Sequence, residues 1–92
     1  MNFGEALGAL KEGKKLRRAG WNGRNMFIFL TPGSIVPYSK CKEETQKAFI
    51  DHPTSTITIG GHIDMKAADG TLVIGWLASQ TDILSEDWEV VV

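Results

Sequence analysis

The sequence predicts an α+β fold in which an N-terminal helix packs on a small, twisted antiparallel β-sheet. Two observations support this fold class. Apolar residues near the N-terminus recur at the spacing of one helix face, whereas the second half of the chain has short alternating runs separated by glycine turns. A length of 92 residues allows one domain with one modest core. We therefore expect residues 1–92 to form a single domain.

The first predicted element is an amphipathic helix over residues 2–12. Its apolar face is made by residues at i, i+3, i+4 and i+7: Phe3, Ala6, Leu7 and Leu10. Asn2 and Glu5 match a capping box at its start, and Gly13 is a natural stop after its end. Two internal glycines weaken the isolated helix, so it must be held by packing on another element.

Two strands are predicted next, over residues 15–19 and 25–31, with Leu16 pointing inward and the turn 21–23 between them. A large aromatic residue is an unusual choice for such a turn, because Asn-Gly alone would make it. Trp21 therefore either covers the edge of the core or forms a platform for a ligand.

The middle of the chain, residues 33–55, is predicted to be the least regular part. Pro32, Pro37 and Pro53 punctuate it, and residues 43–50 match a short helix. A connection of this length in a small domain is usually functional or mobile.

The second half returns to strands, over residues 56–59, 62–67, 71–77 and 87–92. Asp69-Gly70 is a strong hairpin signal between the second and third of these. Residues 79–84 match a short helical turn before the last strand.

The predicted strands are apolar on both faces, as residues 26–30 and 71–77 show most clearly. An antiparallel sheet with one face in water should alternate apolar and polar residues. One helix of about three turns covers only one face. We therefore expect the other face to meet a second subunit, in a homo-oligomer.

Composition and charge argue against several classes of protein. A net charge of −1 argues against a nucleic-acid polymer as partner. No stretch approaches the roughly 18 apolar residues of a membrane span, and the N-terminus lacks the pattern of a signal peptide. The single cysteine, Cys41, permits no intrachain disulfide, which fits a reducing compartment. We expect a cytoplasmic protein.

A basic run at Lys14, Lys15, Arg17 and Arg18 is a local exception to this balance. It fits a patch for a small anion, but a solvated strand edge is the simpler interpretation.

Catalytic signatures are scarce. The sequence has no GxxxxGK[ST] loop, GxGxxG, HExxH or CxxC motif. His62 and Asp64 with His52 lack the close ligand pairs of a zinc site. We assign no catalytic residue, no metal and no cofactor.

Three tryptophans in so short a chain favour binding instead. We expect Trp88, on an alternating strand, to be core. For Trp21 and Trp76, a core position and a ligand platform remain equally open. Aromatic faces beside amides and hydroxyls suit a nucleotide pocket, because the rings stack a base and the polar groups bind ribose and phosphate.

Two segments, MNFGEALGALKEGKKLRRAGWNG at the start and HIDMKAADGTLVIGWLASQTDILSEDWEVV near the end, resemble the phage Thoeris anti-defence sponge family of the second type. The GWNG turn and the W-x-x-[ST]-Q-x-D-[IL]-L-x-x-D-W signature are the most specific parts, and residues 33–55 match less clearly. The resemblance implies a protein without enzymatic activity that binds cyclic nucleotide immune signals, first of all glycocyclic ADP-ribose. Held uncleaved, the signal does not reach the Thoeris effector.

The resemblance also implies a homotetramer in the host cytoplasm, with signal pockets between subunits. Some relatives take up cyclic oligonucleotides, the signals of CBASS defence, at a separate site. By motif position the ligand site includes Trp21, Asn22, Gly23, Met26, Phe27, Trp76, Ser79, Gln80 and Asp82. We add Arg24 for the phosphates, with the turn amides. Trp21 and Trp76 would stack, and Asn22, Gln80 and Asp82 would bind ribose.

Two other functions remain open from the sequence. One is a small phosphodiesterase that destroys the same signal with His62, Asp64 and Asp82. The other is a structural phage interaction module, in which the tryptophans are interface core.

Overall fold

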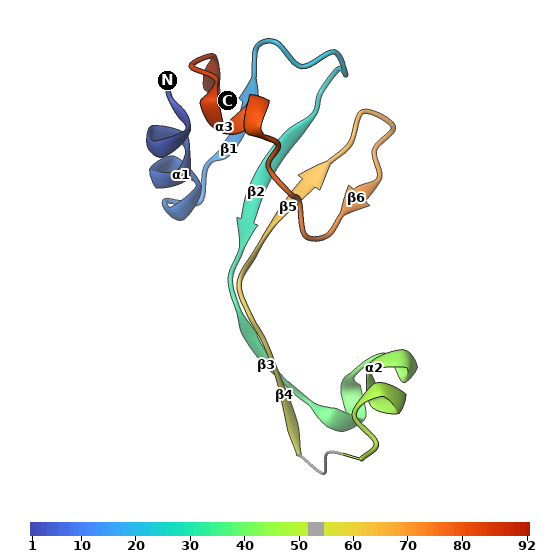
Figure 1. Ribbon diagram of the computed structural model, residues 1–92. Helices are drawn as coiled ribbons and strands as arrows, with labels where there is room; N and C mark the ends of the chain where they lie inside the picture. The colour runs from blue at the N-terminus through green and yellow to red at the C-terminus, as the bar shows by residue number, and fades with distance from the viewer. Residues whose placement is uncertain (52–54) are drawn as a thin grey trace. The chain divides into compact units, whose positions relative to one another are not determined.

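The computed structural model describes residues 1–51 and 55–92, and the chain forms two compact units (Figure 1). The first unit comprises Met1–Thr31 and His62–Val92, and the second comprises Pro32–Gly61. The elements in chain order are α1 Phe3–Lys11, β1 Lys15–Arg18, β2 Phe27–Thr31, β3 Ser34–Pro37, the 3₁₀ turn η1 Tyr38–Lys40, α2 Glu43–Ala48, β4 Thr56–Ile59, β5 His62–Lys66, β6 Leu72–Val73, α3 Gln80–Leu84 and β7 Trp88–Val91.

The first unit is built on a five-stranded antiparallel sheet of order β6-β5-β2-β1-β7. Its register places Leu16 opposite Ile28, Ile28 opposite Met65, and Met65 opposite Val73. Since residues directly opposite each other share a face, these side chains form one apolar row across the sheet. The α+β class with an antiparallel sheet is therefore confirmed.

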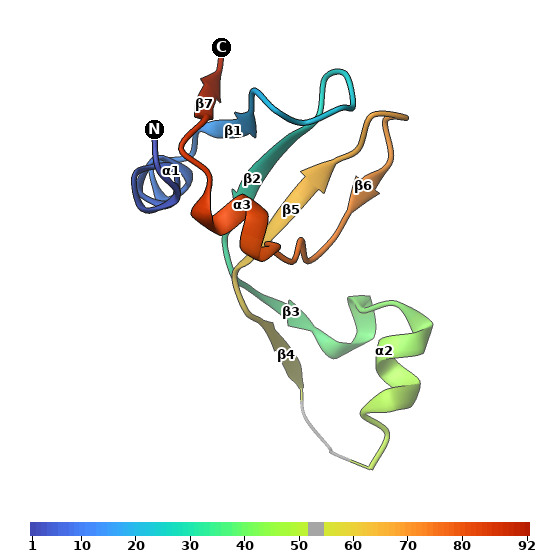
Figure 2. The same cartoon turned by 45° about the horizontal axis from the view of Figure 1, so that its top comes forward.

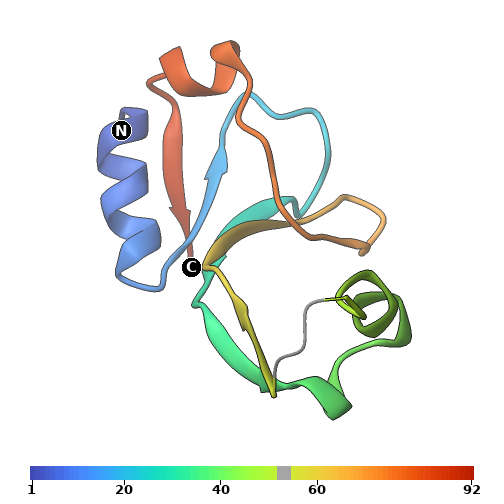
Figure 3. The ribbon, with the colours of Figure 1, turned by 60° about the horizontal axis from the view of Figure 1, so that its bottom comes forward.

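Helix α1 lies alongside β7 and β1, as Figure 3 shows. The core between them consists of Ala6, Leu10, Leu16, Ile28 and Trp88, each at most 2% exposed. The capping box is confirmed, because Asn2 Oδ1 accepts from the Glu5 amide at 2.8 Å and Glu5 Oε1 accepts from the Asn2 amide at 3.0 Å. Gly13 follows the helix with a φ of +87°, the left-handed conformation that a helix stop requires.

The other face of β2 carries Phe27 and Phe29, which are half-buried. The Nζ atoms of Lys15 and Lys66 lie 5.0 and 5.9 Å from the centroid of the Phe27 ring. Lysine stems and their charges thus cover part of the second apolar face within one chain.

The strand expected over residues 71–77 is wrong beyond Val73. Gly75 has a φ of +81°, which interrupts the regular pairing with β5. Its amide donates to Asp64 Oδ1 at 3.0 Å, and the next amide, of Trp76, donates to the Ile63 carbonyl at 2.6 Å. The Asp69-Gly70 hairpin that begins this segment is confirmed, with Gly70 at a φ of +90°.

The second unit corrects the expectation of an irregular middle. Strands β3 and β4 pair antiparallel from Ser34 opposite Ile59 to Pro37 opposite Thr56, and they run side by side in Figure 2. Strand β3 is hard to predict because it is four residues long and ends in proline. The short helix is confirmed as α2, whereas Pro53 and His52 lie outside the described residues.

Within the part of the chain that the structure describes, no helix combines the length and the apolar character needed to cross a membrane.

Candidate functional site

The three tryptophans meet at one end of the core of the first unit. Trp21 and Trp76 pack edge-to-face on Trp88, with ring centroids 5.3 and 6.1 Å away, and they lie 6.4 Å from each other. Trp88 is 2% exposed, so its predicted core position is confirmed. Trp21 and Trp76 are half-buried and cover the edge of that core.

The connection between β1 and β2 spans residues 19–26 and is tied to the C-terminal segment by two carboxylates, Asp82 and Asp87, which also bind Arg18 at the end of β1. Arg18 donates from Nη1 to Asp82 Oδ1 and from Nε to Asp87 Oδ1, each at 2.8 Å. The same Asp82 oxygen accepts the indole N–H of Trp21 at 3.1 Å, and Asp87 Oδ2 accepts the amide of Gly20 at 2.8 Å. The two carboxylates thus fix both the backbone and the aromatic ring at the start of the connection.

These contacts favour the charged form of all three groups. The hydrogen bond to Asp87 and then that to Asp82 raise the pKa of Arg18 above its ordinary value. Burial by itself raises the pKa of Asp82, but hydrogen bonds from Arg18, Trp21 and Ser79 outweigh it and the net shift is downward. The hydrogen bond from Arg18 is the main cause of the lowered pKa of Asp87.

The two glycines beside Trp21 serve close approach rather than a left-handed turn, since neither has a positive φ. A Cβ on Gly20 would lie 2.8 Å from Asp87 Oδ2, and one on Gly23 would overlap with Met26 Sδ. The residue with positive φ is Asn25, at 58°, immediately before Met26 and two residues before β2. Asparagine tolerates this conformation better than most residues.

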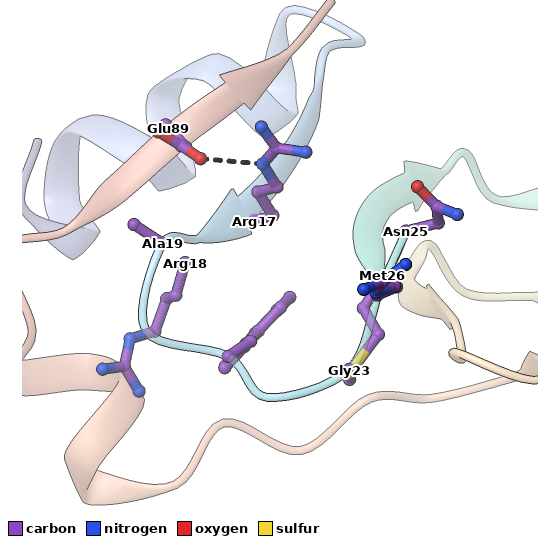
Figure 4. Close-up of a pocket in the computed structure, with 9 residues that line it drawn as sticks. Arg17, Arg18, Ala19, Gly23, Asn25, Met26 and Glu89 are labelled. Atoms are coloured by element: carbon purple, nitrogen blue, oxygen red, sulfur yellow. Dashed lines mark hydrogen bonds and ion pairs between the residues drawn. The ribbon is translucent and has the colours of Figure 1, made fainter.

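Beside this connection the first unit has a hollow of about 460 Å³. Its volume falls within the range of about 300–1,000 Å³ that is usual for small-molecule sites. The lining residues are Arg17, Arg18, Ala19, Trp21, Gly23, Arg24, Asn25, Met26 and Glu89, and Figure 4 shows them. In that view the guanidinium of Arg18 points toward α3, while that of Arg17 lies beside β7.

The three arginines of the hollow differ in how their charge is balanced. Arg18 is enclosed by two carboxylates, and its side chain is 15% exposed. Arg17 pairs with Glu89 through Nε alone, at 2.8 Å and with both side chains partly in solvent. Arg24 is exposed and has no ion pair or hydrogen bond with another described residue. The hollow therefore has an uncommitted cation and an aromatic ring among its lining residues.

Four of the ten residues expected at the site line the hollow: Trp21, Gly23, Arg24 and Met26. Asn22 is exposed between them, and Phe27 begins β2. Neither these two nor the other four are lining residues. Trp76 packs on Trp21, Ser79 caps α3 through the Asp82 amide, and Gln80 is exposed at the start of α3. The carboxylate of Asp82 is already bonded to Arg18 and Trp21, so its role in the structure is to hold the ring.

Sequence reasoning did not place five lining residues: Arg17, Arg18, Ala19, Asn25 and Glu89. The basic run was the available signal for the two arginines. Nothing in the local sequence indicates Glu89, which reaches the hollow because β7 pairs with β1 and lies opposite Arg17.

A second polar cluster surrounds Asp64, which is 2% exposed. It accepts hydrogen bonds from Thr31 Oγ1 at 2.5 Å, His62 Nδ1 at 2.7 Å and the Gly75 amide at 3.0 Å. Burial by itself raises its pKa, but these hydrogen bonds outweigh it and lower the pKa below its ordinary value. Asp64 thus pins the Gly75 turn, and among the described residues it shares no bonding partner with Asp82. His52 lies outside the described residues, and among those described no three His, Cys, Asp or Glu side chains are grouped to hold a metal ion.

Comparison with known proteins relates the whole chain to one family. A family model described as Tad2-like, Thoeris anti-defense 2-like domain, matches residues 1–91. Thoeris anti-defense 2 of Bacillus phage SP01 is 38% identical over 91 residues, which cover 99% of this chain and 94% of that protein. The match spans β1, the connection with Trp21, α3 and β7, and so includes every element of the hollow.

Proposed function

This chain belongs to the Thoeris anti-defense 2-like family, which gives it a phage anti-defence role, and we propose that it acts by binding a cyclic nucleotide signal and holding it uncleaved. The proposed signals are glycocyclic ADP-ribose and, at a separate site, cyclic oligonucleotides. In the host cytoplasm, a bound signal is removed from the pool that activates the Thoeris effector. The observation that carries the proposal is the hollow beside Trp21.

Trp21 is suited to stack a base because its position is fixed before a ligand arrives. Its ring packs on Trp88, and its N–H is bonded to Asp82. A ring held in place loses little rotational freedom on binding, so more of the stacking energy contributes to affinity. Stacking contributes about 1–3 kcal/mol per base in single-stranded nucleic-acid complexes.

Arg24 and the amides of the connection suit the phosphates of such a ligand. Hydrogen bonds between a guanidinium and a phosphate are charge-assisted and roughly twice as strong as neutral ones. Arg24 has no carboxylate partner among the described residues, so phosphate binding there breaks no existing ion pair.

A protein that works by sequestration needs affinity and copy number, not turnover. A nanomolar dissociation constant corresponds to about −12 kcal/mol. For a ligand of about 35 non-hydrogen atoms, an efficiency of about −0.3 kcal/mol per atom gives nearly this value. In this proposal, stacking and charge-assisted phosphate contacts supply that energy.

We further propose that the chain forms a homotetramer. Support comes from the segment after the Asp69-Gly70 turn, where apolar side chains are exposed on the isolated chain. Leu72, Val73, Ile74 and Leu77 are 51%, 43%, 65% and 90% exposed, respectively. A run of exposed apolar residues of this kind usually marks an interface.

Recovery of the ligand separates sequestration from hydrolysis. The protein is incubated with a slight deficit of glycocyclic ADP-ribose, the free ligand is removed by filtration, and the protein is then denatured. We expect the filtrate to be depleted and the intact ligand to reappear on denaturation, as shown by mass spectrometry. Recovery of a cleaved product would instead identify a phosphodiesterase. If all of the glycocyclic ADP-ribose were found in the first filtrate, the protein would not bind this signal. A structural module would then remain as the function.

A further inference from the structure

Arg17 is a second cation of the hollow, and its surroundings resemble those of neither Arg18 nor Arg24. It lies on β1 directly opposite Glu89 of β7, and its Nε donates to Glu89 Oε1 at 2.8 Å. Its side chain is 45% exposed and lines the same hollow as Arg24. The strand register thus fixes an arginine at the wall of the hollow that is only partly committed to its ion pair.

The geometry of this ion pair leaves binding capacity on Arg17. A guanidinium carries five N–H donors, and the contact to Glu89 uses the one on Nε. The two terminal nitrogens make no hydrogen bond to a described residue, and Figure 4 shows them outside the dashed contact. Arg18 has less spare capacity, since its Nε and both terminal nitrogens already bond to Asp82 or Asp87 and its side chain is only 15% exposed.

We propose that Arg17 and Arg24 together form the phosphate-binding part of the hollow, with Arg17 oriented by Glu89. This pair of arginines binds a pyrophosphate group. The inference rests on the proposed ligand site, whose proposed ligand contains a pyrophosphate, and adds to that site Arg17 and its orientation by Glu89. Two guanidinium groups match the adjacent charges of a pyrophosphate better than one does, since each arginine engages phosphate oxygens in a planar fork.

Glu89 has two opposite effects in this arrangement. Its hydrogen bond holds Arg17 in place, whereas its negative charge opposes an anion in the hollow. It is the sole acid among the nine lining residues. The substitution Glu89→Gln separates the two effects, because glutamine keeps an oxygen that accepts from Nε and loses the charge.

The test uses inorganic pyrophosphate as the probe, titrated calorimetrically into the full chain at low salt. We expect Arg17→Ala and Arg24→Ala each to weaken binding by about 10- to 100-fold, the range for a charge-assisted hydrogen bond. The affinity of Arg17→Lys for pyrophosphate should fall between those of wild type and Arg17→Ala, because lysine keeps the charge but not the planar fork of donors. Glu89→Gln should bind pyrophosphate about 2- to 10-fold more tightly.

The control is Lys14→Ala, which makes the same change in net charge outside the hollow. Lys14 is exposed, pairs with Glu12 and is not a lining residue. The affinity of the Lys14→Ala variant for pyrophosphate should stay within about twofold of wild type. Unfolding midpoints should show that all variants are folded. A loss as large in Lys14→Ala as in Arg17→Ala would mean that net charge alone sets the affinity, and would overturn the proposal.

Three further results would overturn it: no binding of pyrophosphate by wild type, wild-type affinity in Arg17→Ala, or weaker binding in Glu89→Gln. The proposed function is tested separately, with glycocyclic ADP-ribose. If wild type binds pyrophosphate through Arg17 but ignores the cyclic nucleotide, the function fails and the anion site stands. If the cyclic nucleotide binds and Arg17→Ala leaves both affinities unchanged, the anion site fails and the function stands.

Discussion

The indole nitrogen of Trp21 donates a hydrogen bond of 3.1 Å to Oδ1 of Asp82, across 61 residues of sequence. The same oxygen accepts Nη1 of Arg18 at 2.8 Å. The GWNG turn and the C-terminal W-x-x-S-Q-x-D segment are therefore parts of one structure. The position of the aromatic ring in the hollow is set by a residue in a different part of the sequence.

Replacing Asp82 by asparagine should destabilise the protein. The carboxylate is 14% exposed, and asparagine leaves Arg18 with a neutral neighbour whose amide can point a donor at it. We expect a loss of about 1–3 kcal/mol in the free energy of unfolding, measured by urea denaturation.

The control for Asp82→Asn is Glu43→Gln, which removes a carboxylate from the exposed pair with Lys47 in α2. That substitution should change the free energy of unfolding by less than about 0.5 kcal/mol. Equal stability of the two variants would show that the Asp82 contacts do not hold the connection in place.

Two glycine-to-alanine substitutions should change the free energy of unfolding in opposite directions. A Cβ on Gly20 would lie 2.8 Å from Asp87 Oδ2, which must move away from its contacts with Gly20 and Arg18, so we expect a loss of about 1–2 kcal/mol. Gly8 lies within α1 and a Cβ there meets no atom within 4 Å. Gly8→Ala should therefore stabilise by about 0.5–1 kcal/mol. Thermal unfolding of both variants measures this, and a shift of the same sign in both would contradict the explanation.

Asp64 should make the protein sensitive to acid. Although burial by itself raises its pKa, the hydrogen bonds from Thr31, Gly75 and His62 hold the pKa below the ordinary value of 3.8. A carboxyl group with a lower pKa in the folded state adds stability above its unfolded pKa and loses it as the pH falls through the folded pKa. We expect the free energy of unfolding to drop below about pH 4.

Asp64→Asn isolates this contribution from that of the other carboxylates. The variant should be less stable than wild type at pH 7, because a buried amide replaces a carboxylate that accepts three hydrogen bonds. Its stability should also depend less on pH between about pH 5 and 2. Parallel curves for the two proteins over that range would show that Asp64 is not titrating with a shifted pKa.

The helix and most of the sheet could be predicted because their signals are local. Capping residues, the stop at Gly13 and the Asp69-Gly70 turn each act within a few residues. The end of β6 could not be predicted, because the Gly75 amide bonds to the side chain of Asp64 on β5 and not to a backbone carbonyl of that strand, a contact over 11 residues that local sequence does not indicate. Strand β3 was missed because four residues ending in Pro37 show little alternation.

The candidate site was predictable only in part, because some of its residues are brought together by contacts between distant parts of the sequence. Trp21 and Arg24 stand out beside the glycine turn, and both line the hollow. The basic run pointed to Arg17 without deciding between an anion site and a solvated edge. Only the register of β1 against β7 places Glu89 opposite it. Asp82 was expected to bind ribose, but its bonds to Arg18 and Trp21 give it a positioning role in the isolated chain.

The proposed tetramer should depend on the exposed segment after β6. Leu77 is 90% exposed and Ile74 is 65% exposed, so charged substitutions there cost little in the isolated chain. We expect wild type to have the mass of four chains in light scattering, and Ile74→Lys with Leu77→Lys to reduce it. Lys11→Ala on α1, where the side chain is exposed, serves as the control. A wild-type mass of one chain would contradict the proposed assembly.

Calorimetric titration of glycocyclic ADP-ribose into wild type, Trp21→Phe and Trp21→Ala tests the central claim most directly. We predict nanomolar binding by wild type, a loss of about 10- to 100-fold in Trp21→Ala, and a smaller loss in Trp21→Phe, which keeps a ring for stacking but not the N–H. Phe49→Ala removes an aromatic side chain that does not line the hollow, and should bind like wild type. Wild-type affinity in a folded Trp21→Ala variant would show that the signal does not bind at this hollow.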